Sequence, residues 1–235
     1  MADLMDMASQ IISMETRRIE AASQNIANIA TPGYKRQMAF SQYLPAAPGQ
    51  VQEAGGLSVA NATDFTPGRL IATDNPMHFA LAGEGFFEFT SSSGSVYSRH
   101  GALQLDDRGR LVSPQGWPLQ AAGGGDVVIR GKDWKVEKDG TVVEEGRPVS
   151  RIRVVEFADP AALTRVAGGA FQAGKQAPTE VNAVMVRQGF IESANVSTAD
   201  DMIRTMESIR RAEVGQKLVH AYDDMLGQAL RQTGQ

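Results

Sequence analysis

The chain has no cysteine, few aromatic residues and no long apolar run. None of its 235 residues is a cysteine, which excludes disulfides, zinc–thiolate sites and cysteine nucleophiles. No segment approaches the roughly 20 apolar residues that are needed to cross a bilayer, so we expect no direct membrane insertion. The 23 basic and 27 acidic residues leave a net charge of −4, which provides no electrostatic footprint for nucleic acid.

The N-terminus lacks the features of a cleaved secretory signal. Asp3 and Asp6 lie where a basic region should be, and Glu15 and Arg17 interrupt any apolar core. A conventional signal peptide is therefore not expected, and this observation alone leaves the compartment open.

Both ends of the chain have a helical pattern. Residues 1–30 contain neither glycine nor proline and carry apolar residues at helical spacing, which predicts a helix of about seven or eight turns. A second helix is expected from Ala199 to about Arg231, with Thr198 as its N-cap. It has two apolar stripes, one of which contains Met206 and the other Leu218.

The middle of the chain has the sequence pattern of β-strands. Proline and glycine punctuate residues 36–69, which predicts an extended arm with one short strand at most. Short apolar runs alternate with turn signals after that, and we assign Phe86, Phe87 and Trp117 to the core of an all-β domain. The expected domains are residues 1–35, 36–69, 70–178 and 179–235.

These segments predict an α+β fold in which the two terminal helices pair as a coiled-coil-like hairpin. Each helix has an apolar stripe that must be covered, and the β domain can cover only part of two long rods. We expect the helices to pair with each other and the remaining apolar surface to contact neighbouring subunits.

The sequence shows no catalytic constellation. It has no G-x-S-x-G elbow and no H-E-x-x-H motif, and its 3 histidines are isolated from one another. Gly83-Glu84-Gly85 reads as a turn because no lysine follows it. We therefore expect no catalytic, cofactor-binding or metal site and no enzymatic activity; the alternative is a hydrolase with a cryptic polar pocket.

Four blocks of the sequence resemble bacterial flagellar rod and hook proteins. Residues 22–35, Ala-Ser-Gln-Asn-Ile-Ala-Asn-Ile-Ala-Thr-Pro-Gly-Tyr-Lys, resemble the N-terminal signature of that family, with Tyr34 where phenylalanine is commoner. Residues 81–87 and 97–118 resemble two further blocks, with His100 in place of the usual asparagine. Residues 188–196 and the helix after them resemble the C-terminal block.

The resemblance implies a structural subunit of the rod, the axial shaft that crosses the periplasm. Such subunits are exported through the flagellar type III apparatus without a cleaved signal, and they assemble with copies of themselves and with other rod proteins. The length and the single middle domain favour the proximal rod; the distal rod is the second reading. A secreted binding module with helical stalks, outside the flagellum, is a further alternative and predicts a folded monomer.

Within this reading, burial of the apolar stripes on joining the rod would order the terminal helices. Asn25, Asn28 and Asn195 are expected to fix the register of the contacts, although Asn28 and Asn195 read equally well as helix-end and capping residues. The expected contact residues between subunits are Leu4, Ile11, Ile19, Asn25, Ile26, Asn28, Asn195, Met202, Met206, Ile209, Leu218 and Met225.

Overall fold

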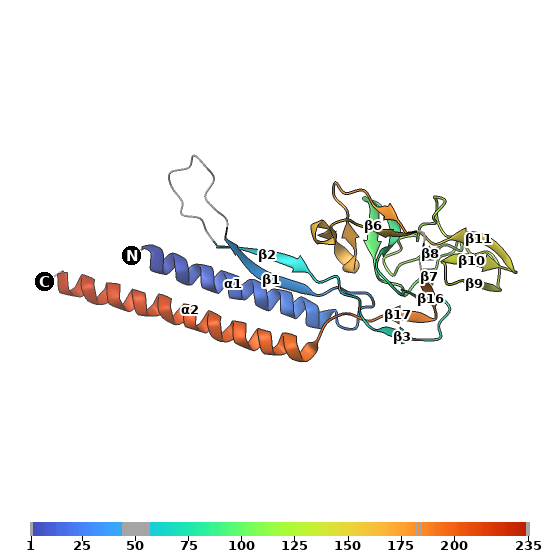
Figure 1. Ribbon diagram of the computed structural model, residues 1–235. Coiled ribbons are helices and arrows are strands. Elements are labelled where there is room, and N and C mark those ends of the chain that lie inside the picture. Colours follow the sequence, from blue (N-terminus) through green and yellow to red (C-terminus); the bar gives the residue numbers. More distant parts are fainter. Residues whose placement is uncertain (1, 44–56, 182, 184, 234–235) are drawn as a thin grey trace. The chain divides into compact units, whose positions relative to one another are not determined.

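The computed structural model describes residues 2–43, 57–181, 183 and 185–233. The chain divides into two compact units (Figure 1). Unit 1 contains residues 1–27, 37–64 and 196–235, and unit 2 contains residues 28–36 and 65–195. The expected α+β fold is confirmed, since two terminal helices pack together and the middle of the chain is β-rich.

Unit 1 is built on two helices, α1 (Ala2–Ala27) and α2 (Thr198–Thr233). They pack side by side and antiparallel (Figure 1), as expected for a hairpin of terminal helices. The expected N-cap at Thr198 is wrong by one residue. The hydroxyl of Ser197 accepts a hydrogen bond from the backbone N–H of Asp200, which is how an N-cap side chain satisfies the third N–H of a helix.

Unit 1 also contains a pair of strands where the sequence predicted at most one. Strands β1 (Gln37–Tyr43) and β2 (Leu57–Thr63) pair antiparallel along their whole length, and β1 packs on α1. The segment expected to be an extended arm thus pairs with itself, because strand pairing satisfies backbone groups that an extended arm leaves open. Residues 44–56 of that arm lie outside the described residues. The four domains expected from the sequence pattern stay a prediction.

Unit 2 is composed of short antiparallel strands joined by turns and two 3₁₀ helices. Its longest sheet has the order β13-β14-β6-β5-β12-β15, and a three-stranded sheet has the order β11-β10-β9. The remaining strands form the pairs β16-β4, β17-β3 and β7-β8. The elements are β3 (Leu70–Ala72), β4 (Phe79–Leu81), β5 (Phe86–Ser91), β6 (Gly94–Ser98), β7 (Gln104–Leu105), β8 (Leu111–Val112), β9 (Trp134–Val136), β10 (Thr141–Glu144), β11 (Arg147–Arg151), β12 (Val154–Glu156), η1 (Pro160–Ala162), β13 (Thr164–Arg165), η2 (Ala167–Gly169), β14 (Phe171–Gln172), β15 (Thr179–Glu180), β16 (Val186–Gln188) and β17 (Phe190–Glu192).

Two apolar clusters form the core of unit 2, and β5 separates them. Phe87 and Phe89 belong to the larger cluster and Phe86 to the smaller one, because successive side chains of a strand point to opposite faces. Trp117 packs partly buried against the larger cluster. The core assignment made for Phe86, Phe87 and Trp117 is therefore confirmed.

Candidate subunit interface

The two helices of unit 1 meet along a seam of small residues. Ala8 and Ala22 are buried on α1, and Ser208 and Gly215 are buried on α2. The buried and half-buried positions of α2 recur at alternating steps of four and three residues, from Asp201 to Tyr222. This is the seam of a coiled coil, and its α2 positions from Asp201 to Gly215 are small or polar residues.

Gly215 is the place where the helices approach each other closely. A Cβ atom added there would lie 2.9 Å from Ile12 Cγ1, 3.5 Å from Ile11 Cγ2 and 3.6 Å from the Ala8 carbonyl oxygen. A glycine inside a helix costs about 1 kcal/mol relative to alanine. Here the missing side chain makes room for the partner helix, which accounts for the residue.

A buried carboxylate lies in the same seam. The Glu15 side chain is 1% exposed, and its Oε1 accepts a hydrogen bond from Arg18 Nη1 at 2.8 Å. Arg211 Nη1 of α2 approaches the same oxygen at 3.9 Å. A buried acid that pairs with cations of both helices disfavours shifted registers of the pair, because a slip would remove the Arg211 partner and leave Arg18 of the same helix to compensate the buried charge.

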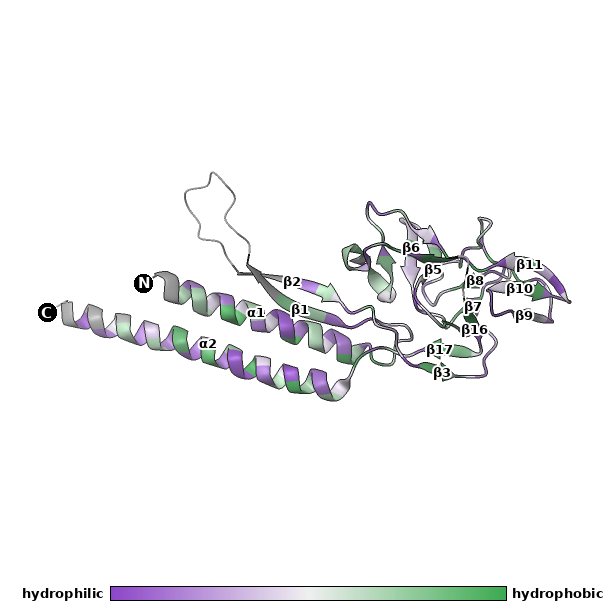
Figure 2. Ribbon diagram, in the orientation of Figure 1, coloured by the Kyte–Doolittle hydropathy of each residue, from purple (hydrophilic) through white to green (hydrophobic). Residues whose placement is uncertain are grey.

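The larger apolar side chains of α2 face solvent. Met206 is 61% exposed, and four more of the expected contact residues are exposed as well. Figure 2 shows apolar and polar residues alternating along this helix. We call the exposed apolar side chains of α2 its outer face. Ile203 and Val214 belong to this face, although they are not among the contact residues expected from the sequence. Its expected members are Met202, Met206, Ile209, Leu218 and Met225.

The expected contact residues of α1 are less accessible. Ile11, Ile19 and Ile26 are half-buried within unit 1. Leu4 lies in α1, but its side chain is outside the described ones. Each of the three isoleucines is partly covered within unit 1 and partly exposed to solvent. The role of the four residues in contacts between subunits stays a prediction.

Asn25 joins α1 to the start of β1. Its side chain is buried, its Nδ2 donates to the Gln37 carbonyl, and its Oδ1 accepts from the Gln37 N–H, both at 2.8 Å. The amide thus pairs with one backbone residue as a neighbouring strand would. It fixes a register inside the chain.

Asn195 and Asn28 lie in unit 2. Asn195 Oδ1 accepts from the Arg36 N–H at 2.7 Å, and its Nδ2 donates to the Thr66 carbonyl at 3.0 Å. Asn28 accepts a hydrogen bond from the Thr31 hydroxyl at 3.3 Å, and its carbonyl accepts one from the Thr31 N–H. Asn28 thus closes a turn, and Asn195 ties together segments that are far apart in sequence. Any role of either residue in register between subunits stays a prediction.

Three charged residues form a buried ion triad in unit 2. Lys35 Nζ lies 2.6 Å from Glu192 Oε1, and Arg99 Nη1 lies 3.3 Å from Glu192 Oε2; the side chains are at most 4% exposed. The Gly68 N–H also donates to Glu192 Oε1, and Arg99 Nη2 donates to the Gly83 carbonyl. A buried charge is tolerated only when paired and hydrogen-bonded in this way.

The triad joins three segments that are far apart in sequence, and each belongs to a block that resembles the rod family. Gly33 has a φ of +69°, and a Cβ there would lie 2.3 Å from the Arg99 carbonyl carbon. Its N–H donates to the Glu192 carbonyl at 2.7 Å. Tyr34 is buried beneath the guanidinium of Arg165, whose carbon lies 4.8 Å from the ring centroid. The motifs that contain Gly33, Arg99 and Glu192 do not by themselves predict that these residues meet.

Burial sets the proton affinities near the triad. It lowers the pKa of the Arg99 guanidinium, and the Glu192 carboxylate opposes that shift. Burial also lowers the pKa of the His100 imidazole. His100 Nδ1 donates to the Pro32 carbonyl at 2.9 Å, which raises the pKa again in part. The imidazole is therefore held in its neutral form more strongly than in an unfolded chain.

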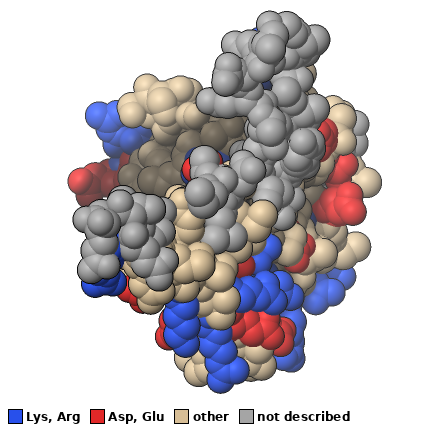
Figure 3. Space-filling model, turned by 90° about the vertical axis from the view of Figure 1, so that its left-hand side faces the viewer, with Lys and Arg blue, Asp and Glu red and all other residues tan. Residues whose placement is uncertain are grey.

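Charges of both signs occur together on the surface that Figure 3 presents. On α2, for example, Arg211 pairs with Glu207 one turn away at 3.8 Å. Among the described residues we find no group of three or more side chains suited to holding a metal ion. The described helices likewise include none long and apolar enough to span a bilayer.

Two family models match the chain. The model of the flagellar hook protein FlgE/F/G D1 domain matches residues 80–144, from β4 to β10. The model of the flagellar basal body rod FlgEFG protein C-terminal region matches residues 187–232, which include Glu192 and the outer face of α2. Both matches support the flagellar basal-body rod protein family.

Relatives in that family align over most of their length. FlgF of Salmonella typhimurium is 28% identical over 250 residues, which cover 96% of this chain and 94% of the relative. FlgF of Caulobacter vibrioides is 26% identical, with 93% and 92% covered. FlgG of Buchnera aphidicola subsp. Schizaphis graminum is 24% identical, with 87% and 89% covered. These relatives support a structural subunit of the basal-body rod, and the rod family implies assembly with other rod proteins.

Proposed function

We propose that this chain is a subunit of the proximal rod and polymerises through its terminal helices into the axial drive shaft. The observation that carries the proposal is the outer face of α2. Seven large apolar side chains there are between 39% and 61% exposed, while the seam with α1 uses small residues. An exposed apolar surface of this kind marks a site of protein contact.

The same arrangement supports ordering on assembly. In an isolated chain, the pairing of α1 with α2 leaves the outer face of α2 without apolar cover. Long helices without apolar cover are marginal in water. Contacts with neighbouring subunits would bury the outer face at roughly 25 cal/mol per Å², which offsets the cost of ordering the helices.

The finer parts of the proposal concern partners and location. The chain contacts copies of itself and other rod proteins, reaches the periplasm-spanning rod through the flagellar type III export apparatus, and does so without a cleaved signal peptide. It acts without a cofactor and without catalysis, binds no nucleic acid and does not insert directly into a membrane. Torque passes through many helix contacts in parallel.

The distal rod is the second candidate position. Relatives named FlgF and FlgG align with similar identities, and the alignments cover nearly the whole of both. The single middle β domain and the length support the proximal rod. Imaging of isolated basal bodies with this subunit labelled decides between them, since a label beyond the proximal segment contradicts the first assignment.

A charge on the outer face tests polymerisation. Met206→Glu places a carboxylate at a side chain that is 61% exposed, so the isolated chain should retain its helix content and its unfolding midpoint. Incorporation into basal bodies should be lost, because the carboxylate would be buried without a partner in the contact. The measurement is immunoblotting of purified basal bodies from cells that carry only the variant.

Gln216→Glu is the matched control, because it adds the same charge at an exposed polar position of α2. It should incorporate like the natural chain. Incorporation of Met206→Glu at the level of this control would refute the role of the outer face.

A further inference from the structure

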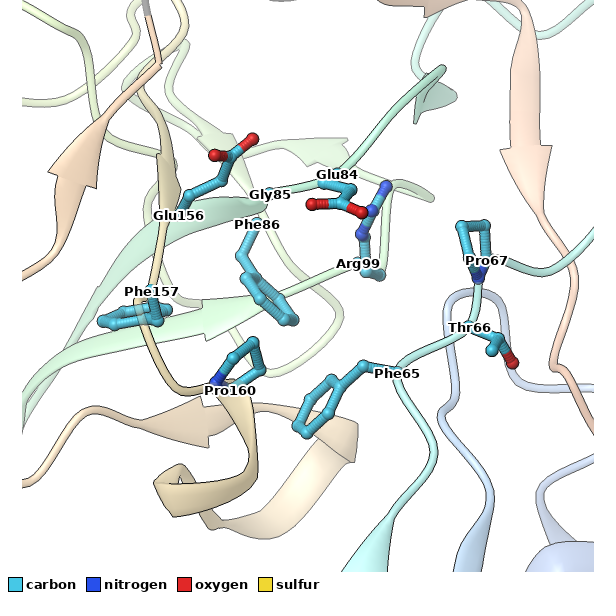
Figure 4. Close-up of a pocket in the computed structure, with 10 residues that line it drawn as sticks. All are labelled: Phe65, Thr66, Pro67, Glu84, Gly85, Phe86, Arg99, Glu156, Phe157 and Pro160. Carbon is cyan, nitrogen blue, oxygen red and sulfur yellow. The ribbon is translucent and has the colours of Figure 1, made fainter.

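Unit 2 contains a hollow of about 300 Å³ between β5, β12 and the segments around Phe65 and Pro160. Figure 4 shows Phe65, Phe86, Phe157 and Pro160 surrounding one end of it, with Glu84 and Glu156 at the other. We call it the acidic hollow. Its volume is at the lower end of the range for small-molecule sites, which suits one or two protein side chains.

The hollow is lined by more carboxylates than cations. Arg99 lines it and interacts electrostatically with Glu84 and Glu156, but its guanidinium is also paired with Glu192 and donates to the Gly83 carbonyl. Within the described part of the chain, no ion pair neutralises Glu84 or Glu156. A fitting occupant therefore has an apolar part for the rings and a cation for the two carboxylates.

The β10–β11 hairpin presents such a pair of side chains. Glu145 and Gly146 form its tight turn with φ values of 48° and 78°, the combination typical of a rigid type I′ hairpin. Val149 is the extra residue of a β-bulge, since Ser150 pairs with Val142 and Pro148 with Val143. It is 54% exposed. Arg147 is exposed two residues away and has no ion pair among the described residues.

The hairpin is not arranged to add a strand to another sheet. β11 is the edge of its sheet, and Pro148 removes a backbone donor from that edge. Proline and bulges at an edge block strand addition. A bulge also re-aims side chains, so this edge is suited to contacts by side chains such as Val149 and Arg147.

We propose that the acidic hollow is the socket for the β10–β11 hairpin of a second copy of this chain. Val149 packs against the phenylalanine rings, and Arg147 lies between Glu84 and Glu156. Within unit 2 the hairpin and η1, which adjoins the hollow, lie well apart (Figure 1), so the hairpin cannot fill the hollow of its own unit. Two different surfaces that meet in this way propagate head to tail, and the inference rests on the proposed self-association.

Engineered cysteines test this contact. The natural chain has no cysteine, so every cross-link within or to this chain forms at an introduced thiol. Val149→Cys and Ala158→Cys place one thiol on the hairpin and one on an exposed residue beside Phe157. In purified basal bodies, a short bismaleimide should link two and more copies into a ladder. The matched control pairs Ala158→Cys with Leu105→Cys, an exposed apolar residue of β7, and should give no ladder.

Charge reversal then tests the chemistry in the same cysteine background. Arg147→Glu should lower the yield of the ladder about tenfold, the effect expected for a close interfacial charge pair. Adding Glu84→Lys and Glu156→Lys should restore the yield. Failure to restore it overturns the assignment of these charges to one another.

The outcomes separate this inference from the proposed function. Absence of the natural chain from purified basal bodies contradicts both. Variants that are present but give no more product than the control overturn the socket alone. A product that joins this chain to a different protein overturns the second copy as the occupant.

Discussion

Lys35 and Glu192 lie 157 positions apart in sequence and form a buried ion pair, with 2.6 Å between Nζ and Oε1. The pair ties the segment that follows α1 to the strand that precedes α2. Arg99 adds a third segment through the other carboxylate oxygen. Residues that resemble the rod-family signature thus hold together one end of the β domain.

The ion triad should dominate the stability of unit 2. Glu192→Gln leaves two buried cations without a carboxylate, so the free energy of unfolding should fall by about 3 to 5 kcal/mol. Glu180→Gln is the control: its partly exposed pair with Arg151 should contribute less than about 1 kcal/mol. Denaturant titration followed by the fluorescence of Trp117 and Trp134, both in unit 2, measures this. Equal losses in the two variants would contradict the importance of the triad.

Gly215 should tolerate no large side chain. Gly215→Leu drives side-chain atoms into Ile12 and Ile11, and overpacking of this kind costs about 1 to 3 kcal/mol. Gly227→Leu is the matched control, because among the described side chains a Cβ there comes within 4 Å of Arg231 Nη2 alone, at 3.7 Å, and the variant should gain up to about 1 kcal/mol of helix propensity. Thermal unfolding followed by far-UV circular dichroism compares them. A Gly215→Leu chain as stable as the Gly227→Leu chain would mean that the helices do not approach at this glycine.

Asn25→Ala should loosen β1 from α1. The change removes both hydrogen bonds to Gln37 inside a buried site, which costs about 1 to 3 kcal/mol. Hydrogen exchange of the Gln37 amide should accelerate most, because Asn25 Oδ1 accepts from that N–H. Asn61→Ala, an exposed position of β2, should leave the exchange unchanged. Unaltered exchange in Asn25→Ala would show that this amide does not hold the strand.

His100 should make the stability of unit 2 depend on pH. Its pKa is lowered in the folded chain by burial, so the unfolded chain binds the proton more tightly. The stability that this group contributes is therefore complete above about pH 6.5, the unfolded pKa. It is lost as the pH falls through the folded pKa. His100→Asn should flatten this part of the profile, as measured by denaturant midpoints from pH 7.5 downward to about pH 5. The same slope in both chains would exclude His100 as its source.

The sequence alone determined the two terminal helices and the β-rich middle of the chain, because local patterns carry that information. The long segment without glycine or proline became α1. The apolar stripes of α2 and the family motifs could also be recognised from the sequence, since residue spacing and motifs are local properties of a chain.

Only the tertiary structure decided which residues meet. Lys35 and Glu192 lie 157 positions apart in sequence, and no local sequence pattern predicts a contact over that separation. Gly215 weakens a helix when it is considered alone, and only the approach of Ile12 explains it. From Asp201 to Gly215, α2 faces α1 with small and polar residues and leaves Met206 outside, because close approach of two backbones favours small side chains over large ones.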